Sequence, residues 1–381
     1  METVFYDGRP IFEAANSKEL AKAVEAFDDD VKPPYVVRIP EGATEVVDSA
    51  FFEDKTIGTV LLPCSVTTIE ECAFWSCTNL RSIFIPNSVK EIKKRAFEKC
   101  TNLTEINIPE SVTMIGPDAF SGCVWLTSIN ISPSNDVYDS REDCNAIIET
   151  KSNKLIFGCR NTVIPYSVEE IGLEAFKGCI GLKQVSIPST VTYIGPGAFS
   201  YCKGLELVDL DNTKVTKIVD DTFLNCTSLK RIRIPNTVTK ILGDTFSGCT
   251  SLTDVYLPNS LTEIASRVFE GCTSLNGIYI PDSVKEIGER AFMDCTSLVE
   301  IDIHNSVKVL GYYAGWFEGC TNLERIYTIH PDLRKCDDAE KAEILPPRAN
   351  SPIKKKWEKE TQNMDIVRAI EEVSIRNGLR I

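Results

Sequence analysis

The sequence predicts an α/β repeat solenoid, because one pattern of residues recurs along most of its 381 residues. One copy begins at Pro86, and the next begins at Pro109, 23 residues later. Most copies hold a short run of alternating β-branched residues that ends at proline, and then a phenylalanine, usually after alanine, followed by a cysteine; the first copy has Asp54 at the cysteine position, and the sixth has Asp211 near the proline position. The first run favours a strand with one face inward, and the Ala-Phe segment favours a tight turn or short helix across the back.

A period of roughly 20 to 29 residues with an L-x-x-L-x-L core is the signature of leucine-rich repeats. Eleven copies cover residues 37–327, with a longer one at residues 132–164. One coil cannot enclose its own Leu, Ile and Phe side chains, so neighbouring coils must stack at the spacing of strands in a sheet, about 4.8 Å. We therefore expect a right-handed leucine-rich-repeat horseshoe, with parallel strands on the concave face and short helices or turns on the convex face.

Residues 1–36 are predicted to form an N-terminal αβ cap over the first coil. Asn16 precedes a helical pattern, and Glu19 follows it by three residues, which is the spacing of a capping box. A terminal coil needs such a cover, because its outer side would otherwise expose apolar side chains.

A linker at residues 328–351 and an amphipathic helix at residues 352–377 are expected after the last repeat. Ser351 before Pro352 is a helix start signal. An apolar stripe runs along the predicted helix and consists of Ile353, Trp357, Met364, Val367 and Ile370. The stripe fits two interpretations: a cap folded back on the solenoid, or a helix that binds a partner or a second copy of the chain.

The longer repeat contains the run CNAIIETKSNKLIFGC, which predicts two strands around Lys151 and Ser152. Cys144 and Cys159 are equidistant from that centre, so a symmetric hairpin would place them opposite each other. A disulfide between them is therefore a candidate, although cross-strand sulfurs rarely reach the required dihedral angle without strain. The alternative is that both are reduced, as we expect for most of the fifteen cysteines.

The composition excludes several classes of partner. Lys and Arg number 41 against 55 Asp and Glu, a net charge of −14, so nucleic-acid binding is not expected. No run reaches the roughly 18 apolar residues that a membrane helix requires, so membrane insertion is not expected either. The first residues lack the cationic start and the apolar run of an export signal, which predicts a cytoplasmic location.

No pattern predicts catalysis, a metal site or a cofactor. The two histidines, His304 and His330, have no catalytic signature around them and are expected to be structural or solvated. One cysteine per coil supplies a line of buried thiols rather than a tetrahedral group of metal ligands. These cysteines are Cys77, Cys100, Cys123, Cys179, Cys202, Cys226, Cys249, Cys272, Cys295 and Cys320.

The residues that flank the inward position of each strand are expected to point away from the core and to be available to a partner. Towards the C-terminal end they are rich in tyrosine and arginine, which are enriched at binding hot spots. The predicted partner-binding residues are Phe84, Arg231, Arg233, Asp254, Tyr256, Tyr279, Glu300, Asp302, Arg325 and Tyr327. Strand propensity and cross-strand pairing also favour tyrosine at such positions, so that interpretation stays open.

The repeats IPNSVKEIKKRAFEKCTNL and IPDSVKEIGERAFMDCTSL closely resemble the BspA-like leucine-rich repeat family, as does the longer repeat at residues 135–165. The resemblance covers most of the chain and implies the leucine-rich-repeat fold, without any catalytic motif. Members of that family are commonly bacterial surface or secreted proteins, some of them implied in adhesion. The resemblance therefore also implies an extracellular or cell-surface location.

These patterns together predict a non-enzymatic scaffold or receptor that binds a protein partner through the concave face. One alternative is a bacterial surface or secreted adhesin that binds host or cell-surface proteins. Another is a structural or regulatory subunit that forms a homo-oligomer through its C-terminal helix.

Overall fold

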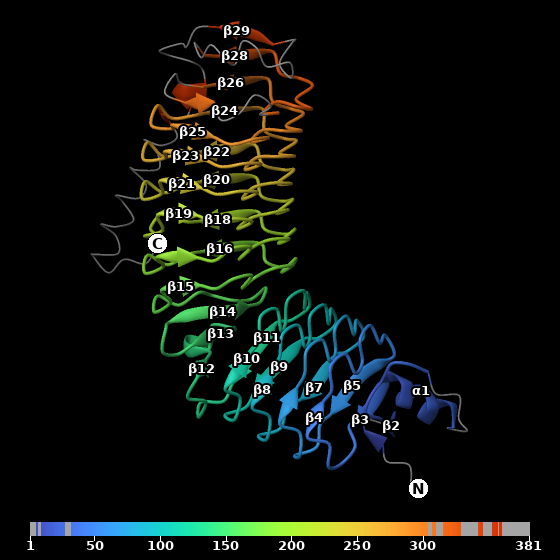
Figure 1. Cartoon of the computed structure of the whole chain (residues 1–381). Helices are drawn as coiled ribbons and strands as arrows, with labels where there is room; N and C mark the ends of the chain where they lie inside the picture. Colours follow the sequence, from blue (N-terminus) through green and yellow to red (C-terminus); the bar gives the residue numbers. More distant parts are fainter. Residues whose placement is uncertain are drawn as a thin grey trace. The chain divides into compact units, whose positions relative to one another are not determined.

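The computed structural model divides the chain into two compact units (Figure 1). The first unit comprises residues 1–208, 212–215 and 221–227, and the second unit comprises residues 209–211, 216–220 and 228–381. The residues that the structure describes are 5–6, 9–26, 32–303, 307–309, 315–328, 342–345, 353–356 and 358–359.

Parallel strands, one from each coil, line one side of the first unit. They are β5 (Ile57–Leu61), β7 (Ser82–Phe84), β9 (Glu105–Ile108), β11 (Ser128–Ile131), β16 (Gln184–Ser186) and β18 (Leu207–Asp209), whose last residue is counted with the second unit. A second column of two-residue strands consists of β4 (Glu45–Val46), β6 (Thr68–Ile69), β8 (Glu91–Ile92), β10 (Met114–Ile115), β15 (Glu170–Ile171) and β17 (Tyr193–Ile194). Equivalent residues pair, as Ile83 does with Val60, because the repeat length is the same in both coils.

The second unit repeats this arrangement. Its longer strands are β20 (Arg231–Arg233), β22 (Asp254–Tyr256), β24 (Gly277–Tyr279), β26 (Glu300–Asp302), β28 (Arg325–Tyr327) and β29 (Glu343–Leu345). The second column consists of β19 (Lys217–Ile218), β21 (Lys240–Ile241), β23 (Glu263–Ile264), β25 (Glu286–Ile287) and β27 (Lys308–Val309). β29 pairs in parallel with β28, so the predicted linker at 328–351 contains a strand that continues the sheet.

Most longer strands bury a central residue and turn its neighbours outward. Ile83 in β7 is 6% exposed and Ile232 in β20 is 1% exposed, whereas the residues on either side of Ile83 are exposed. This alternation is the two-residue period of a strand with one face on the core. We call the surface formed by the outward residues of the longer strands the strand face.

The core is a column of phenylalanines, one from each coil. In the first unit Phe74 stacks between Phe51 and Phe97, with ring centroids 5.5 and 5.3 Å apart. In the second unit Phe269 lies 5.7 Å from Phe246 and 5.5 Å from Phe292. All these rings are fully buried, so each coil supplies the apolar surface that its neighbour needs.

Turns, not helices, form the back of the described coils. Cys72 and Arg95, at equivalent positions, have φ of 55° and 57°, and a residue in this left-handed region ends a right-handed helix. Hydrogen bonds between coils replace those of a helix, since the Phe74 N–H donates to the Ala96 carbonyl at 2.8 Å. The predicted leucine-rich-repeat fold is confirmed, with turns as its back structure.

The repeated cysteines form the expected line of buried thiols. Nine of the ten are buried, and Cys179, in the coil after the longer repeat, is partly exposed. The Cys100 thiol donates to the Phe74 carbonyl at 3.1 Å, and the Cys272 thiol donates to the Phe246 carbonyl at 3.3 Å. Because only a reduced thiol can donate, this bond explains why cysteine fits a buried position beside a carbonyl of the preceding coil.

A small αβ structure stands at the start of the first unit. β1 (Phe5–Tyr6) pairs antiparallel with β2 (Arg9–Glu13), which pairs in parallel with β3 (Tyr35–Arg38), and β3 pairs with β5. Helix α1 (Ser17–Glu25) follows Asn16, whose side chain accepts from the Lys18 and Glu19 N–H groups. The Glu19 carboxylate accepts from the Ala15 N–H at 2.8 Å, so the cap is close to the predicted capping box.

The longer repeat forms the predicted hairpin but not the candidate disulfide. After β12 (Tyr138–Asp139) and a 3₁₀ turn at 141–143, β13 (Ala146–Glu149) pairs antiparallel with β14 (Lys154–Gly158). The register shifts between Ile147 and Ile148, so Cys144 and Cys159 are not opposite each other, and both are free thiols. A bulge of this kind is common in antiparallel pairs and breaks the symmetry that the sequence suggests.

Candidate protein-binding site

Strand pairing aligns the outward residues of the second unit into two columns on its strand face. Arg231 pairs with Asp254, and Arg233 pairs with Tyr256. In β24, β26 and β28 the paired residues are Gly277, Glu300 and Arg325 in one column, and Tyr279, Asp302 and Tyr327 in the other. All the predicted partner-binding residues except Phe84 therefore lie in these two columns.

Charged side chains on this face pair with one another. Arg325 Nε lies 3.4 Å from Glu300 Oε2, and the Tyr327 hydroxyl donates to the same oxygen at 3.4 Å. Arg233 Nη1 lies 3.5 Å from Asp211 Oδ2. Arg231, in contrast, is an exposed residue. The face therefore presents the exposed Arg231 beside charged side chains that pair with one another.

Three of the predicted residues are not open to solvent. Tyr279 is 5% exposed, Asp302 is 6% exposed and Tyr327 is 2% exposed. Tyr327 lies between Asp302 and Leu345 of β29, and burial together with the neighbouring Asp282 carboxylate raises the pKa of the Tyr279 phenol. The structure thus corrects the expectation that these three side chains are available to a partner.

A helical segment near the C-terminus lies on the same face. Residues 353–356 and 358–359 are helical, and we call them the tail helix. Figure 1 shows it in red beside β24. Lys356 Nζ lies 2.6 Å from Asp254 Oδ1, and Lys354 Nζ lies 5.5 Å from the centre of the Tyr279 ring. Tyr279 is therefore covered by the chain itself.

Ile353 occupies the place where β24 lacks a side chain. A Cβ at Gly277 would lie 3.3 Å from Ile353 Cδ1, which is tighter than ordinary van der Waals contact. A cavity of about 30 Å³ remains between these residues and the neighbouring strands, which is enough to hold water. Gly277 was the signal in the sequence, because other longer strands carry a side chain at the equivalent position, as Asp254 and Glu300 do.

The contact with the tail helix lowers the pKa of the Asp254 carboxyl. Burial alone would raise its pKa, but hydrogen bonds from Lys356 and from Thr253 outweigh burial and hold the pKa below its usual value. The ionised carboxylate is the form that these donors favour. The tail helix and β22 thus form a charge-assisted contact at neutral pH.

Phe84, the remaining predicted residue, lies on the strand face of the first unit and is 67% exposed. Two strands of the same face carry a polar ladder: the Asn130 amide donates to Asn107 Oδ1 and to Glu105 Oε1, both at 3.0 Å.

Most of the predicted oligomerisation stripe lies outside the described residues, namely Trp357, Met364, Val367 and Ile370. The two histidines, His304 and His330, also lie outside them.

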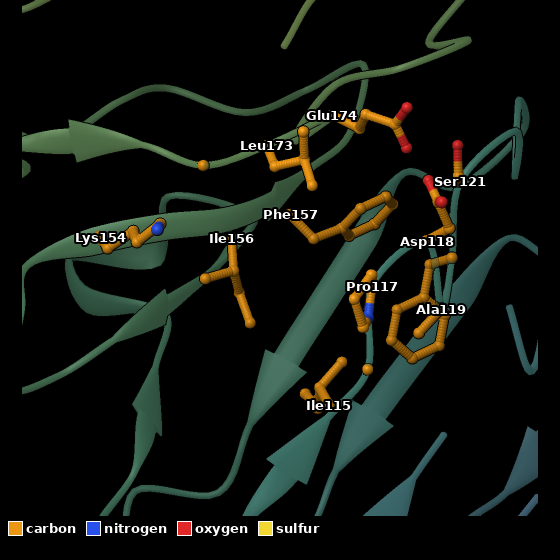
Figure 2. Close-up of a pocket in the computed structure, with 13 residues that line it drawn as sticks. Ile115, Pro117, Asp118, Ala119, Ser121, Lys154, Ile156, Phe157, Leu173 and Glu174 are labelled. Atoms are coloured by element: carbon orange, nitrogen blue, oxygen red, sulfur yellow. The ribbon is translucent and has the colours of Figure 1, made fainter. Parts of the chain in front are cut away.

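The first unit also contains a cavity of about 200 Å³ beside the longer repeat (Figure 2). It opens where the repeat is interrupted, because Phe120 meets Phe157 of β14 at an angle of 47° rather than in a parallel stack. Its lining is mainly apolar, with Asp118 and Glu174 at one side. The volume is below the roughly 300 to 1,000 Å³ typical of small-molecule sites, so it suits a group no larger than one side chain.

A lysine pairs with both of these carboxylates. Lys177 Nζ lies 2.7 Å from Glu174 Oε1 and 3.9 Å from Asp118 Oδ1. Burial and the hydrogen bond with Asp118 raise the pKa of the Glu174 carboxyl. These two carboxylates therefore form an internal ion cluster with Lys177.

Within the described ranges, no group of His, Cys, Asp or Glu side chains has the arrangement that a metal ion requires. A search of the same part of the chain finds no helix long and apolar enough to cross a membrane.

Solved structures with the same fold include proteins from several bacteria. A leucine rich cell surface protein from Faecalibacterium prausnitzii is 24% identical over 77% of this chain and 87% of its own, with a TM-score of 0.51. A leucine-rich repeat protein from Eubacterium ventriosum is 21% identical over 75% and 86%, also with a TM-score of 0.51. The pneumococcal vaccine antigen PcpA is 17% identical over 89% and 83%, with a TM-score of 0.57. At these identities the similarity shows the fold.

None of the curated proteins matches the sequence. The family of the BspA type leucine rich repeat region, present in six copies, matches residues 26–143, 148–275 and 239–338. These segments span most of the chain and contain both columns of strands in each unit, except β29. The chain belongs to the BspA-type leucine-rich repeat family.

Proposed function

We propose that this protein is a non-enzymatic scaffold or receptor that recognises a protein partner through the strand face of its second unit. The observation that supports this most directly is the alternation in β20 and β22. Ile232 and Val255 fill the core, while Arg231, Asp254 and Tyr256 lie on the opposite side of their strands. The repeat therefore fixes the backbone of these strands without fixing their outward side chains.

The outward residue types suit a protein partner. Arginine and tyrosine bury a large area and keep a polar group, and they are the residues that most often dominate protein interfaces. They stand on paired strands, so little backbone entropy is lost when a partner binds. Tyr279, Asp302 and Tyr327 take a supporting role in this proposal, because they are buried.

A charge reversal at Arg231 tests the proposal. The full-length chain, its Arg231→Glu variant and its Lys285→Glu variant are used to capture proteins from a lysate of the source organism, followed by mass spectrometry. Lys285 is exposed and lies outside the longer strands, so it matches the change in charge but not the position. We expect a partner that Arg231→Glu loses and Lys285→Glu keeps.

Equal capture by all three chains, with no partner specific to the strand face, would contradict the proposal. Thermal unfolding of each variant provides the control for folding. A change at an exposed charge should alter the free energy of unfolding by no more than about 0.5 kcal/mol.

A cell-surface location is part of the same proposal, on the basis of the family to which the repeats belong. Recognition would then concern a host or cell-surface protein, as for an adhesin. Fractionation of the source cells, with an antibody against the chain, separates this location from the cytoplasm. Presence in the membrane or medium fraction supports the adhesin, and confinement to the cytosolic fraction contradicts it.

A further inference from the structure

We infer that the strand face around Gly277 is a docking groove for a short basic helix, and that the tail helix is its intramolecular occupant. The groove comprises Asp254, Tyr256, Gly277 and Tyr279 on β22 and β24. The inference concerns the chain's own contacts, and only its extension to an outside partner depends on the proposed function.

Three contacts of different kinds meet in this groove. Ile353 fills the space above Gly277, Lys356 pairs with Asp254 at 2.6 Å, and Lys354 lies over the Tyr279 ring at 5.5 Å. An apolar slot, a carboxylate and an aromatic face thus each receive the chemical group that they favour. The tail helix therefore makes the contacts that a bound ligand would make in this groove.

The spacing within the tail helix matches the groove. Ile353 and Lys356 are three residues apart, so in a helix they lie on one side and reach Gly277 and Asp254 together. A Cβ at Gly277 would lie 3.3 Å from Ile353 Cδ1, so Ile353 would have to move by a few tenths of an ångström, and a longer side chain would fill the slot. The groove consequently selects a branched aliphatic residue followed, three residues later, by lysine.

A groove filled from within the same chain is closed to weaker competitors. A tethered ligand has a high effective concentration, so a helix from another protein must bind much more tightly, or the tail helix must first be released. The tail helix then controls access to β22, which carries Asp254 and Tyr256 of the proposed recognition surface. A partner that opens the groove carries the same aliphatic and lysine pair on a helix.

A peptide assay on the full-length protein tests this inference. The probe is a fluorescent peptide with the sequence of residues 351–362, and binding is followed by fluorescence polarisation. The two proteins are the natural chain and a released variant with Ile353→Asp and Lys356→Glu. We expect the peptide to bind the released variant at least about tenfold more tightly than the natural chain, because the groove is empty only in the variant.

Two controls assign binding to the groove. Adding Gly277→Leu to the released variant should abolish peptide binding, since the larger side chain fills the slot. Adding Asp254→Lys to a chain released by Ile353→Asp and Lys356→Ala, which has no acidic side chain at position 356 to pair with the new lysine, should abolish binding of the natural peptide and restore binding of a peptide with Lys356→Asp. Circular dichroism and thermal unfolding identify any variant that fails to fold, and the charge swap then decides alone.

Equal binding to both proteins, or binding to neither, would overturn the inference. Light scattering tests whether the tail helix binds the groove of a second copy of the chain instead. If the natural chain is dimeric and the released variant is monomeric, the tail helix binds another copy, and its intramolecular role is overturned. The assay contains no outside partner. Failure of the Arg231→Glu capture experiment would therefore leave this result unchanged.

Discussion

The strand faces of the two units differ although their cores are alike. On the first unit Phe84 is 67% exposed, and every large apolar residue with high exposure in the described chain, from Val47 to Leu207, belongs to that unit. On the second unit the aromatic residues Tyr279 and Tyr327 are buried, and the tail helix and β29 lie beside them. The repeat thus fixes the inward residues, and the rest of the chain decides which outward residues meet solvent.

The largest expected effect is on thiol reactivity, which should show that the two units have equally buried cores. Burial raises the pKa of the Cys123 thiol to about 12 and raises that of the Cys272 thiol well above its ordinary value, whereas Cys64 is exposed. At pH 8 we expect Cys64 to react with iodoacetamide about a thousandfold faster than either buried thiol, because they react only when the coil opens. Peptide mapping of the labelled native chain measures the rates.

The raised pKa values of these thiols also set the direction of a pH effect on stability. Since the folded chain keeps the thiols protonated, their contribution to the free energy of unfolding is complete below the ordinary thiol pKa and falls as the pH rises above it. Fast labelling of Cys272 with slow labelling of Cys123 would show that the cores of the two units differ in stability, and would break the comparison.

Removing one ring from the phenylalanine column should destabilise both units to a similar extent. Phe97→Ala in the first unit and Phe269→Ala in the second each delete a fully buried ring stacked on both sides. We expect each to lower the free energy of unfolding by about 3 to 5 kcal/mol. Urea unfolding followed by circular dichroism measures both, and a loss below about 1 kcal/mol in either unit would contradict an equivalent core.

Truncation of an outward aromatic residue should separate the two faces. Tyr279→Ala removes a buried ring that contacts Lys354, so we expect a loss of about 2 kcal/mol or more. Phe84→Ala removes an exposed ring and should change the free energy of unfolding by no more than about 0.5 kcal/mol. Tyr279→Phe, which keeps the ring, is the matched control; similar losses for Tyr279→Ala and Phe84→Ala would remove the distinction between the faces.

The inward residues could be predicted from the sequence because their regular spacing defines the repeat and therefore the fold. The proline, the Ala-Phe pair and the cysteine each recur at fixed distances, and one coil sets the position of all the others. Short helices and turns share the same apolar spacing, so the choice between them needed the backbone angles of residues such as Cys72 and Arg95.

The outward residues could not be assigned in the same way. Tyr256, Tyr279 and Tyr327 occupy one position of the repeat, yet only the last two are buried. Their burial depends on residues that come later in the chain and that no periodicity connects to them. Gly277 was the single local sign, since a strand position without a side chain often marks a close approach of another group.

The smallest expected effect concerns the ion pair that holds the tail helix to the second unit. Lys356→Met keeps the aliphatic stem and removes the charge that lies 2.6 Å from Asp254, so we expect a loss of about 0.2 to 1 kcal/mol at pH 7. The pKa of Asp254 is lowered in the folded chain, so this stabilisation is present above the ordinary carboxyl pKa and disappears as the pH falls through the lowered value. The natural chain and Lys356→Met should therefore differ in urea unfolding at pH 7 and converge towards pH 3. Phe84→Ala gives the reference without a titratable group, and a difference that persists undiminished at pH 3 would mean that Lys356 acts through packing rather than through the Asp254 carboxylate.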